Sequence, residues 1–208
     1  MRERGELAIK RTLDVLVSIL GLLVLSPVLL VVSILVWLGL GRPILFRQRR
    51  LGYRGVPFIA LKFRSMTDQR NAQGQLLPDG QRITRLGAFL RRSSIDELPQ
   101  LWNVFRDDMS LVGPRPLLMQ YLDRYTPEQA RRHSVCPGIT GWAQVNGRNA
   151  TTWEQRFACD LWYVDHCSFA LDLRILAMTL MRVVQRRGVS AAEAPTMAEF
   201  LGRHNSLD

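Results

Sequence analysis

A long apolar run, broken in its middle by Ser26-Pro27, constrains this chain more than any other feature of the sequence. The run extends from Leu13 to Leu40. At about 1.5 Å per residue, a straight helix of this length would be longer than the roughly 30 Å hydrocarbon core of a bilayer. Proline removes a backbone donor, and a serine hydroxyl can bond back to the preceding turn, so we expect a sharp kink here.

The charges on both sides of the run favour a helix that enters and leaves on one face of a membrane. Positive flanks prefer the cytoplasm, and basic residues stand before and after the run: Arg2, Arg4, Lys10, Arg11, Arg42, Arg47, Arg49 and Arg50. A re-entrant helix over residues 1–42 keeps both groups inside, whereas the alternative, a tilted and kinked span, leaves one group outside. The run is too long for a secretory signal and lacks a small-residue cleavage pattern, so we expect an anchor.

Composition indicates one cytosolic domain with an anionic partner. Residues 43–190 have about the size of one ordinary domain, and residues 191–208 are expected to form an irregular tail. The formal net charge of +10 on 208 residues suits an anionic lipid surface. The sequence carries no zinc-finger, helix-turn-helix or RNA-binding signature, so we expect no nucleic-acid partner. The cysteines, Cys136, Cys159 and Cys167, lack metal-ligand spacing and are expected to be reduced thiols.

Turn signals and apolar spacing predict an α+β fold, mainly α, with one small β-hairpin and surface amphipathic helices. The hairpin is expected from two β-type runs, 43–48 and 57–64, and residues 68–80 are expected to form a surface loop. Helices are predicted over residues 82–92, 94–105, from 126 onward, 152–165 and 171–187. The second helix would begin with a capping box at Ser94. Residues 139–145 are expected to be extended or a tight loop. The last helix could lie on a membrane or pack on the core.

Asp96 and Glu97 are the first candidates for chemistry, because they are adjacent carboxylates that follow Arg91 and Arg92 closely. A helix N-terminus and nearby guanidinium groups both favour anions, so we expect Asp96 to stay ionised and a phosphate to bind beside it. Taken alone, the pair could simply complement the helix dipole, with Glu97 closing the capping box.

Basic residues in stiff or extended segments favour phosphate recognition. Lys62 and Arg64 lie two apart on a predicted strand and so share a face. Arg115 stands between two prolines, and Arg148 follows Asn146-Gly147. The sequence has no Walker or dinucleotide glycine loop and no Ser-His-Asp set. The residues alone therefore indicate a site for phosphates and do not identify a reaction.

Six motifs make the chain resemble the small monotopic phosphoglycosyl transferases, also called bacterial sugar transferases, of glycan assembly. They stand in the family's order between Lys10 and about Gly188, at residues 62–66 (KFRSM), 96–103 (DELPQLWN), 113–116 (GPRP), 137–145 (PGITGWAQV), 160–164 (DLWYV) and 171–173 (LDL). Residues 115–153 look closest to the branch that transfers phospho-bacillosamine or another N-acetylated sugar. Ser65 departs from the family, which often has threonine there, but it keeps a hydroxyl.

The resemblance implies an activity and roles for the candidate residues. Such enzymes move a sugar 1-phosphate from a UDP-sugar to undecaprenyl phosphate in the membrane and release UMP. Asp96 would be the nucleophile of a covalent phosphosugar intermediate, and Glu97 would hold Mg²⁺. A carboxylate can attack a phosphoryl group when cations screen the repulsion, and Mg²⁺ needs only one or two carboxylates. Phosphate contacts are assigned to Lys62, Arg64, Arg91, Arg115 and Arg148, and supporting roles or plain surface charges to Asp160 and Asp172.

The resemblance also implies a re-entrant helix and an active site on the cytoplasmic face of a bacterial inner membrane. Two rivals stay open: Asp96 or Glu97 acts as a base while both substrates are bound, or the chain is a non-catalytic anchored scaffold that binds acidic lipid or nucleic acid. Trp142 is expected to pack rather than to stack on uracil. The sugar, an oligomeric state and contacts with downstream glycosyltransferases are left open by the sequence.

Overall fold

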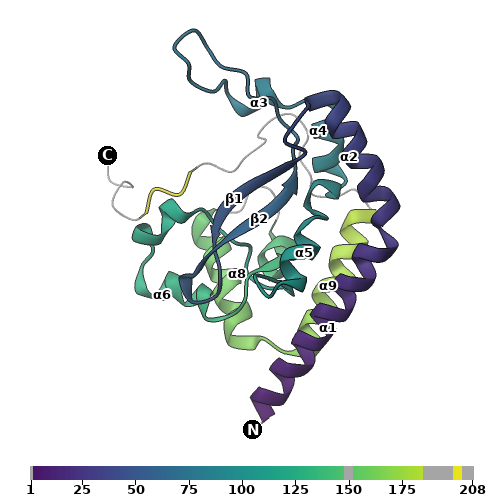
Figure 1. The fold of residues 1–208 in the computed structure, drawn as a ribbon. Helices are drawn as coiled ribbons and strands as arrows, with labels where there is room; N and C mark the ends of the chain where they lie inside the picture. Colours follow the sequence, from purple (N-terminus) through teal and green to yellow (C-terminus); the bar gives the residue numbers. More distant parts are fainter. Residues whose placement is uncertain (1, 148–151, 185–198, 203–208) are drawn as a thin grey trace.

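A bent helix pair runs along one side of a mainly helical α+β domain in the computed structural model, which describes residues 2–147, 152–184 and 199–202 (Figure 1). The fold class predicted from the sequence is therefore confirmed. The helix pair is α1 (Arg2–Val24) and α2 (Ser26–Leu40). The other elements in chain order are β1 (Leu45–Leu51), η1 (Tyr53–Gly55), β2 (Pro57–Phe63), α3 (Asp79–Arg82), α4 (Arg85–Arg92), η2 (Ile95–Glu97), α5 (Gln100–Phe105), β3 (Ser110–Val112), η3 (Met119–Arg124), α6 (Pro127–Ala130), η4 (Arg131–Ser134), β4 (Gly138–Thr140), α7 (Trp142–Asn146), α8 (Trp153–His166) and α9 (Phe169–Val184).

The predicted kink is present between α1 and α2, which are bent by 62° relative to one another. Pro27 lies in the first turn of α2, where its missing N–H is tolerated. The Ser26 hydroxyl donates to the Leu23 carbonyl at 2.7 Å, as a serine beside a helix break can do. Within the described residues no single helix is long and apolar enough to cross a membrane, whereas the bent pair from residue 8 to residue 40 could do so by length and composition. The choice between a re-entrant helix and a span stays a prediction.

One side of α1 is polar and binds the domain. Arg11 donates to the Val104 carbonyl at 2.8 Å, and Lys10 donates to a backbone carbonyl of β3. Asp14 is only 5% exposed and accepts a hydrogen bond of 2.7 Å from the Ser110 hydroxyl. Two of the residues interpreted as flanking charges, Lys10 and Arg11, therefore hold α1 against the domain.

The predicted β-hairpin is confirmed. Its first strand, β1, begins two residues later than the expected run 43–48 and ends three residues later, at Leu51. Strands β1 and β2 are antiparallel, and their register pairs Leu45 with Phe63 and Leu51 with Pro57. Strands β3 and β4 form a second, parallel pair that the sequence did not predict. Their close approach requires glycine, because a Cβ on Gly138 would lie 2.1 Å from the Gly113 nitrogen.

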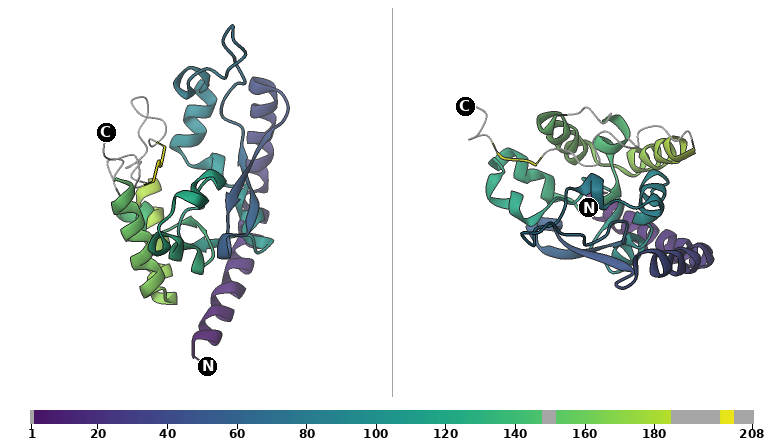
Figure 2. Two further views of the ribbon diagram at one scale, coloured as in Figure 1. Left: turned by 90° about the vertical axis from the view of Figure 1, so that its left-hand side faces the viewer. Right: turned by 90° about the horizontal axis from the view of Figure 1, so that it is seen from above.

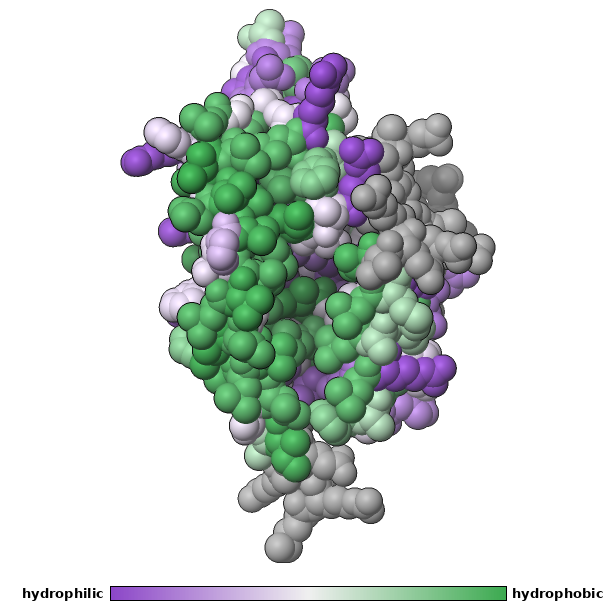
Figure 3. All heavy atoms as spheres, turned by 90° about the vertical axis from the view of Figure 1, so that its right-hand side faces the viewer, coloured by the Kyte–Doolittle hydropathy of each residue, from purple (hydrophilic) through white to green (hydrophobic). Residues whose placement is uncertain are grey.

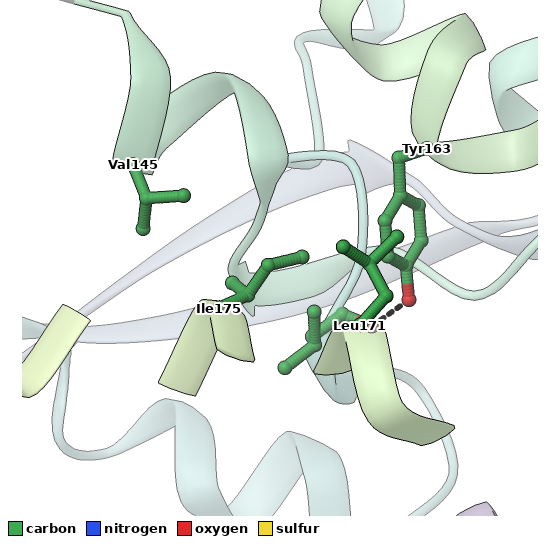
Figure 4. Packing of buried hydrophobic residues seen from close by; sticks show 5 residues of the cluster. Val145, Tyr163, Leu171 and Ile175 are labelled. Carbon is green, nitrogen blue, oxygen red and sulfur yellow. Dashed lines mark hydrogen bonds between the residues drawn. The ribbon is translucent and has the colours of Figure 1, made fainter. Parts of the chain in front are cut away.

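Helices α8 and α9 lie on one side of the domain and the β1–β2 hairpin lies on the other (Figure 2). Much of the packing under α8 and α9 is made by one buried cluster that includes Val145, Tyr163, Leu171 and Ile175 (Figure 4). The Tyr163 hydroxyl lies at the edge of this cluster and donates to the Val112 carbonyl at 3.2 Å. The cluster therefore joins α7, α8, α9 and β3 into one unit.

Several predicted element boundaries are wrong for local reasons. The helix expected over 82–92 is split, because Thr84 caps a new helix by accepting from the Gly87 amide at 2.9 Å. Residues 139–145 are divided between β4 and the short helix α7, which is neither extended nor a loop. The helix start predicted at Thr126 is confirmed and has a capping box, and Thr152 begins α8 with the same motif. All three cysteines are free, as predicted.

A large apolar face covers α1, α2 and α9, and a hollow separates the helix pair from α9 (Figure 3). Exposed residues of this face include Leu16, Leu20, Leu23, Leu30, Val31, Trp37, Leu38, Leu173, Leu180 and Met181. Soluble monomers rarely expose a contiguous apolar patch of this kind, so the face marks an interaction surface. Helix α9 also packs on the core through Leu171 and Ile175, so core packing, one of the two expectations for this helix, is confirmed, whereas a membrane contact stays a prediction. The exposed 68–80 segment extends away from the domain, as a surface loop should (Figure 1).

Removal of the Asp14 carboxylate should loosen α1 from the domain. In Asp14→Ala the Ser110 hydroxyl and the Leu111 amide lose their shared acceptor. An unsatisfied buried donor costs about 1–3 kcal/mol, so we expect a thermal midpoint several degrees below that of the unchanged protein in detergent. The exposed residue Asp123 provides a control, and an equal effect of Asp123→Ala would contradict the prediction.

Candidate active site

Asp96 and Glu97 lie in a single 3₁₀ turn, η2, between α4 and α5. The predicted capping box at Ser94 is wrong. Ser94 has a left-handed backbone, with φ of 57°, and its side chain makes no capping hydrogen bond. Pro99 then separates η2 from α5. The acidic pair is therefore held in a tight corner between two short helices and does not begin a long one.

Glu97 is the centre of a buried ion cluster. Both terminal nitrogens of Arg115 donate to it, one of them to Oε2 at 3.1 Å, and the Lys62 ammonium donates to Oε1 at 2.5 Å. The Glu97 side chain is 17% exposed. Burial alone would raise the pKa of Glu97, but the charges and hydrogen bonds of Arg115 and Lys62 outweigh burial and hold this pKa well below its usual range. Glu97 is thus a permanent anion that ties together η2, β2 and the turn that carries Arg115.

Asp96 has a different environment, although it is the neighbour of Glu97. Its side chain belongs to a residue that is 6% exposed, and within the described residues it accepts no hydrogen bond. Burial, with a smaller contribution from the Glu97 charge, raises the pKa of Asp96 to about 6, against opposing effects of Lys62, Arg115 and Arg91. The direction is opposite to the one expected from a helix terminus and nearby arginines. Above pH 7 most Asp96 side chains are nevertheless ionised.

Arg91 and Ser65 form the wall of the site beside Asp96. The Arg91 Nε donates to the Ser65 hydroxyl at 2.9 Å. Ser65 thus acts as a hydrogen-bond acceptor, and a threonine hydroxyl could do the same. Helix α4 can pack this closely against the Ser65 backbone only because residue 87 is a glycine. A Cβ at this position would lie 1.8 Å from the Ser65 carbonyl oxygen. Gly87 is a residue that the sequence interpretation missed.

Arg64 makes no hydrogen bond or ion pair with Glu97 among the described residues. Its guanidinium donates to the carbonyls of Leu40 and Arg42 at 3.1 and 3.0 Å, and it also binds Asp68. These contacts join the end of α2 to the end of β2 and use the donors that a phosphate would need. The assignment of Arg64 to phosphate binding stays a prediction, and a phosphate bound there would have to replace some of these contacts.

Asp160 supports the site indirectly. It accepts from the Arg132 guanidinium at 3.1 and 2.7 Å, and these side chains are only 2% and 1% exposed. Arg132 also donates to the Arg115 carbonyl at 2.7 Å. The expected supporting role of Asp160 thus has a physical basis, but its partner is Arg132, which the sequence interpretation did not single out.

Asp172 belongs to a different part of the molecule. It pairs with Lys10 of α1 and accepts a hydrogen bond of 2.6 Å from the Tyr163 hydroxyl. It therefore joins α1 to α9 rather than supporting the arginines that are predicted to bind phosphate. Trp142 packs as expected, and its ring stacks on Trp162 at 4.5 Å between centroids.

The structure adds Arg50 to the site, although its position in the sequence suggested only a flank of the apolar run. Arg50 donates to the Pro116 carbonyl at 3.2 Å. Burial and the charge of Arg115 lower the pKa of Arg50 to about 10. The hairpin register could have revealed it, because alternation places Arg50 and Lys62 on the same face. Arg148, a predicted phosphate ligand, lies outside the described residues.

The acidic pair offers the oxygen ligands that Mg²⁺ prefers, but Glu97 is not free to bind it as arranged here. Both Glu97 oxygens already accept hydrogen bonds from Arg115, and one also accepts from Lys62. Within the described residues no group of three or more His, Cys, Asp or Glu could hold a metal ion. The residues therefore fit Mg²⁺ only if bound phosphates take over the two cations and supply the remaining oxygen ligands.

A buried acidic pair surrounded by guanidinium groups and adjoining an apolar helix face is suited to an enzyme that acts on phosphates. The chain belongs to the bacterial sugar transferase family, whose sequence model matches residues 5–186. The predicted family and the predicted transferase class are thereby confirmed.

Three relatives illustrate the range of the family. The chain is 51% identical over 194 residues to the uncharacterized sugar transferase EpsL of Bacillus subtilis strain 168, which covers 93% of this chain and 96% of that protein. It is 42% identical over 185 residues to the UDP-glucose:undecaprenyl-phosphate glucose-1-phosphate transferase of Xanthomonas campestris pv. campestris, covering 84% of this chain but only 38% of that enzyme. It is 40% identical over 195 residues to the exopolysaccharide production protein PSS of Rhizobium leguminosarum bv. phaseoli, with 87% and 98% covered. The N-acetylated branch stays a prediction.

Asp96→Asn should stabilise the metal-free protein at neutral and alkaline pH. The pKa of Asp96 rises from 3.8 to about 6 on folding, so the folded protein binds the extra proton between these values. The cost of keeping Asp96 ionised is therefore fully present above pH 6 and is lost as the pH falls toward 4.

The measurement is thermal unfolding in EDTA from pH 4 to pH 8. We expect the midpoint of Asp96→Asn to exceed that of the unchanged protein at pH 8, with a difference that shrinks at pH 4. The exposed Asp123→Asn serves as the control and should show no such trend. A lower midpoint for Asp96→Asn at pH 8 would contradict the assignment.

Proposed function

We propose that this chain transfers a sugar 1-phosphate from a UDP-sugar to undecaprenyl phosphate and releases UMP, through a covalent intermediate on Asp96. The observation that carries the proposal is the pairing of two unlike carboxylates. Asp96 is buried and accepts no hydrogen bond within the described part of the chain, whereas the adjacent Glu97 is fixed by Arg115 and Lys62. The relatives' names support the acceptor and the class of donor.

The proposed reaction has two displacements at one phosphorus. A carboxylate oxygen of Asp96 attacks the β-phosphorus of the donor, and the bond to the oxygen that bridges the α-phosphorus breaks, so its electron pair leaves with UMP. A phosphate oxygen of undecaprenyl phosphate then attacks the same phosphorus, and the bond to Asp96 breaks. Division into two steps lets donor and acceptor use one site in turn.

The surrounding cations make the first attack electrostatically feasible. An anionic carboxylate and an anionic diphosphate repel, and Arg115, Lys62 and Arg91 are the cations with the largest effects on Asp96. Arginine can bind a phosphate with two parallel hydrogen bonds, while lysine acts as a point charge. Within the described residues Asp96 has no hydrogen bond that must break before it attacks. Mg²⁺, which we propose is held by Glu97 and the donor phosphates, would add a further positive charge on the phosphoryl oxygens.

We also propose that α1 and α2 form a re-entrant membrane helix and that the site faces the cytoplasm of a bacterial inner membrane. The 62° bend, the apolar face and the basic residues after α2 support this arrangement. Lys10 and Arg11 bind the domain rather than lipid headgroups. Their contacts keep the first part of α1 on the same side as the domain.

The identity of the donor sugar is the most specific part of the proposal. The stretch from residue 115 to residue 153 favours an N-acetylated sugar, whereas the Xanthomonas relative is named for UDP-glucose. Both donor classes therefore belong in the first assay, because a pocket discriminates sugars by shape and by hydrogen bonds to their substituents.

The first experiment is UMP release by protein held in nanodiscs with Mg²⁺, undecaprenyl phosphate and a panel of UDP-sugars that includes UDP-glucose and N-acetylated sugars. We expect continuous release over many turnovers that depends on the lipid, on Mg²⁺ and on one donor, and without lipid no more than one UMP per protein. Asp96→Asn should abolish it and Asp123→Asn should not. A radiolabelled donor without lipid should leave a phosphosugar on Asp96, detected by mass spectrometry of the quenched protein.

Two results would favour the rivals. Steady turnover with no trapped adduct on Asp96 would indicate that both substrates bind together and that a carboxylate acts as a base. Full retention of cellular function by Asp96→Asn would favour a non-catalytic anchored scaffold.

Topology is tested separately by tags at residues 1 and 208. We expect both tags to be protected inside intact cells, because a re-entrant helix returns the chain to its starting side. Pro27→Ala should straighten the helix and move the first tag outside. Tags on opposite sides in the unchanged protein would restore the kinked span, and an unmoved tag in Pro27→Ala would show that charge rather than the kink decides.

A further inference from the structure

Two arginines near Arg115 form no salt bridge within the part of the chain that the structure describes, although the charge of Asp160 acts favourably on one of them, Arg156. Within the described residues neither Arg50 nor Arg156 forms an ion pair with a carboxylate. The Arg50 guanidinium binds two neutral oxygens, the Pro116 carbonyl and the Gln48 amide. The Arg156 guanidinium lies over the Trp153 ring, 5.4 Å from its centroid. Both side chains are half-buried, so solvent compensates their charges only in part.

The fold holds Arg50 close to Arg115. The last residues of β1 pair with the chain that follows the Arg115 turn, and the Leu51 amide donates to the Leu117 carbonyl at 3.1 Å. Because Arg50 also binds the Pro116 carbonyl, its backbone and its side chain are both fixed against this turn.

Arg156 approaches the same turn from the other side of the domain. It lies on α8, one helical turn before Asp160, and Asp160 binds the Arg132 that donates to the Arg115 carbonyl. The charge of Arg115 is, after burial, the largest influence that lowers the pKa of both Arg50 and Arg156. The guanidinium group of Arg115 thus repels both Arg50 and Arg156.

This repulsion is not compensated by the acid nearest to it. The single negative charge of Glu97 is already shared between Arg115 and Lys62, which both donate hydrogen bonds to it. Half-buried like charges cost free energy unless an anion joins them, and guanidinium groups bind phosphates well. The geometry therefore calls for an anion from outside the described chain.

The position of Arg115 indicates which phosphate binds here. Its guanidinium donates to Glu97, the chain neighbour of Asp96, and the carbonyl of the next residue, Pro116, accepts from Arg50. Arg115 therefore connects the Asp96 side of the site to Arg50. In a displacement at phosphorus the leaving oxygen lies opposite the attacking oxygen, so the leaving phosphate lies on the side away from Asp96.

Resting on the proposed function, we propose that Arg50 and Arg156 form the subsite for the leaving phosphate of the nucleotide, that is, for the phosphate monoester of UMP. The lipid acceptor carries the same kind of phosphate, but Arg50 lies near the end of the hairpin farther from α2 (Figure 1). A lipid phosphate would arrive from the apolar helices, so the nucleotide phosphate is the better match.

The test measures UMP affinity by calorimetry with protein in nanodiscs. We expect Arg50→Gln and Arg156→Gln each to weaken UMP binding by about tenfold or more, because each removes a charge-assisted contact. Arg50→Lys keeps the charge without the fork and should be intermediate. The neighbouring Arg49→Gln is the matched control, since Arg49 is exposed on the other face of β1, and it should bind UMP like the unchanged protein. Thermal unfolding without ligand checks that the variants fold.

Single-turnover kinetics distinguish the two sources of phosphate. We expect Arg50→Gln to slow UMP release from the donor in the absence of lipid and to leave discharge of the intermediate to undecaprenyl phosphate unchanged. The opposite pattern would assign Arg50 to the lipid phosphate and overturn the proposal. Unchanged UMP affinity in Arg50→Gln would also overturn it, while leaving the proposed function intact. An unchanged protein that binds neither UMP nor any UDP-sugar would remove the proposed function and this subsite together.

Discussion

The buried negative charge of Glu97 is the constraint on which the rest of the site depends. Its two cations come from different elements, Lys62 from β2 and Arg115 from the turn before Leu117. Removal of one partner of a buried ion cluster leaves an uncompensated charge and typically costs several kcal/mol. The hairpin, η2 and the proline-flanked turn must therefore be packed together before the charge of Glu97 is satisfied, and the position of Asp96 is fixed by the same event.

A second set of contacts holds the Arg115 turn from behind. Arg132 binds its carbonyl, and Asp160 neutralises Arg132 in a nearly water-free environment. The glycines of the two parallel strands let the chain on either side of the turn pack closely, since a Cβ on Gly141 would lie 2.1 Å from the Gly113 carbonyl oxygen. Side chains that never reach a phosphate thus determine where Arg115 can place its guanidinium.

The sequence predicted the features that depend on near neighbours and failed where distant packing decides. The kink at Pro27 and the capping box at Thr126 follow from local backbone chemistry, and both are confirmed. The cap at Ser94 was wrong because its left-handed backbone belongs to a corner packed on distant segments. Arg50 was missed because its role requires both the hairpin register and the pairing of β1 with the chain after Pro116. The acidic pair could be found from sequence, but the opposite pKa shifts of its two members could not.

The contacts of Arg64 have a consequence for a lipid acceptor. This residue binds the carbonyl of Leu40, the last residue of α2, and stands two positions after Lys62, which binds Glu97. Only a short hydrogen-bonded connection therefore separates the end of the apolar helix from Asp96 and Glu97. If Asp96 reacts as proposed, this connection fixes the distance between the apolar helices and the reacting phosphorus, so a phosphate on a long hydrocarbon tail would meet Asp96 at one fixed depth.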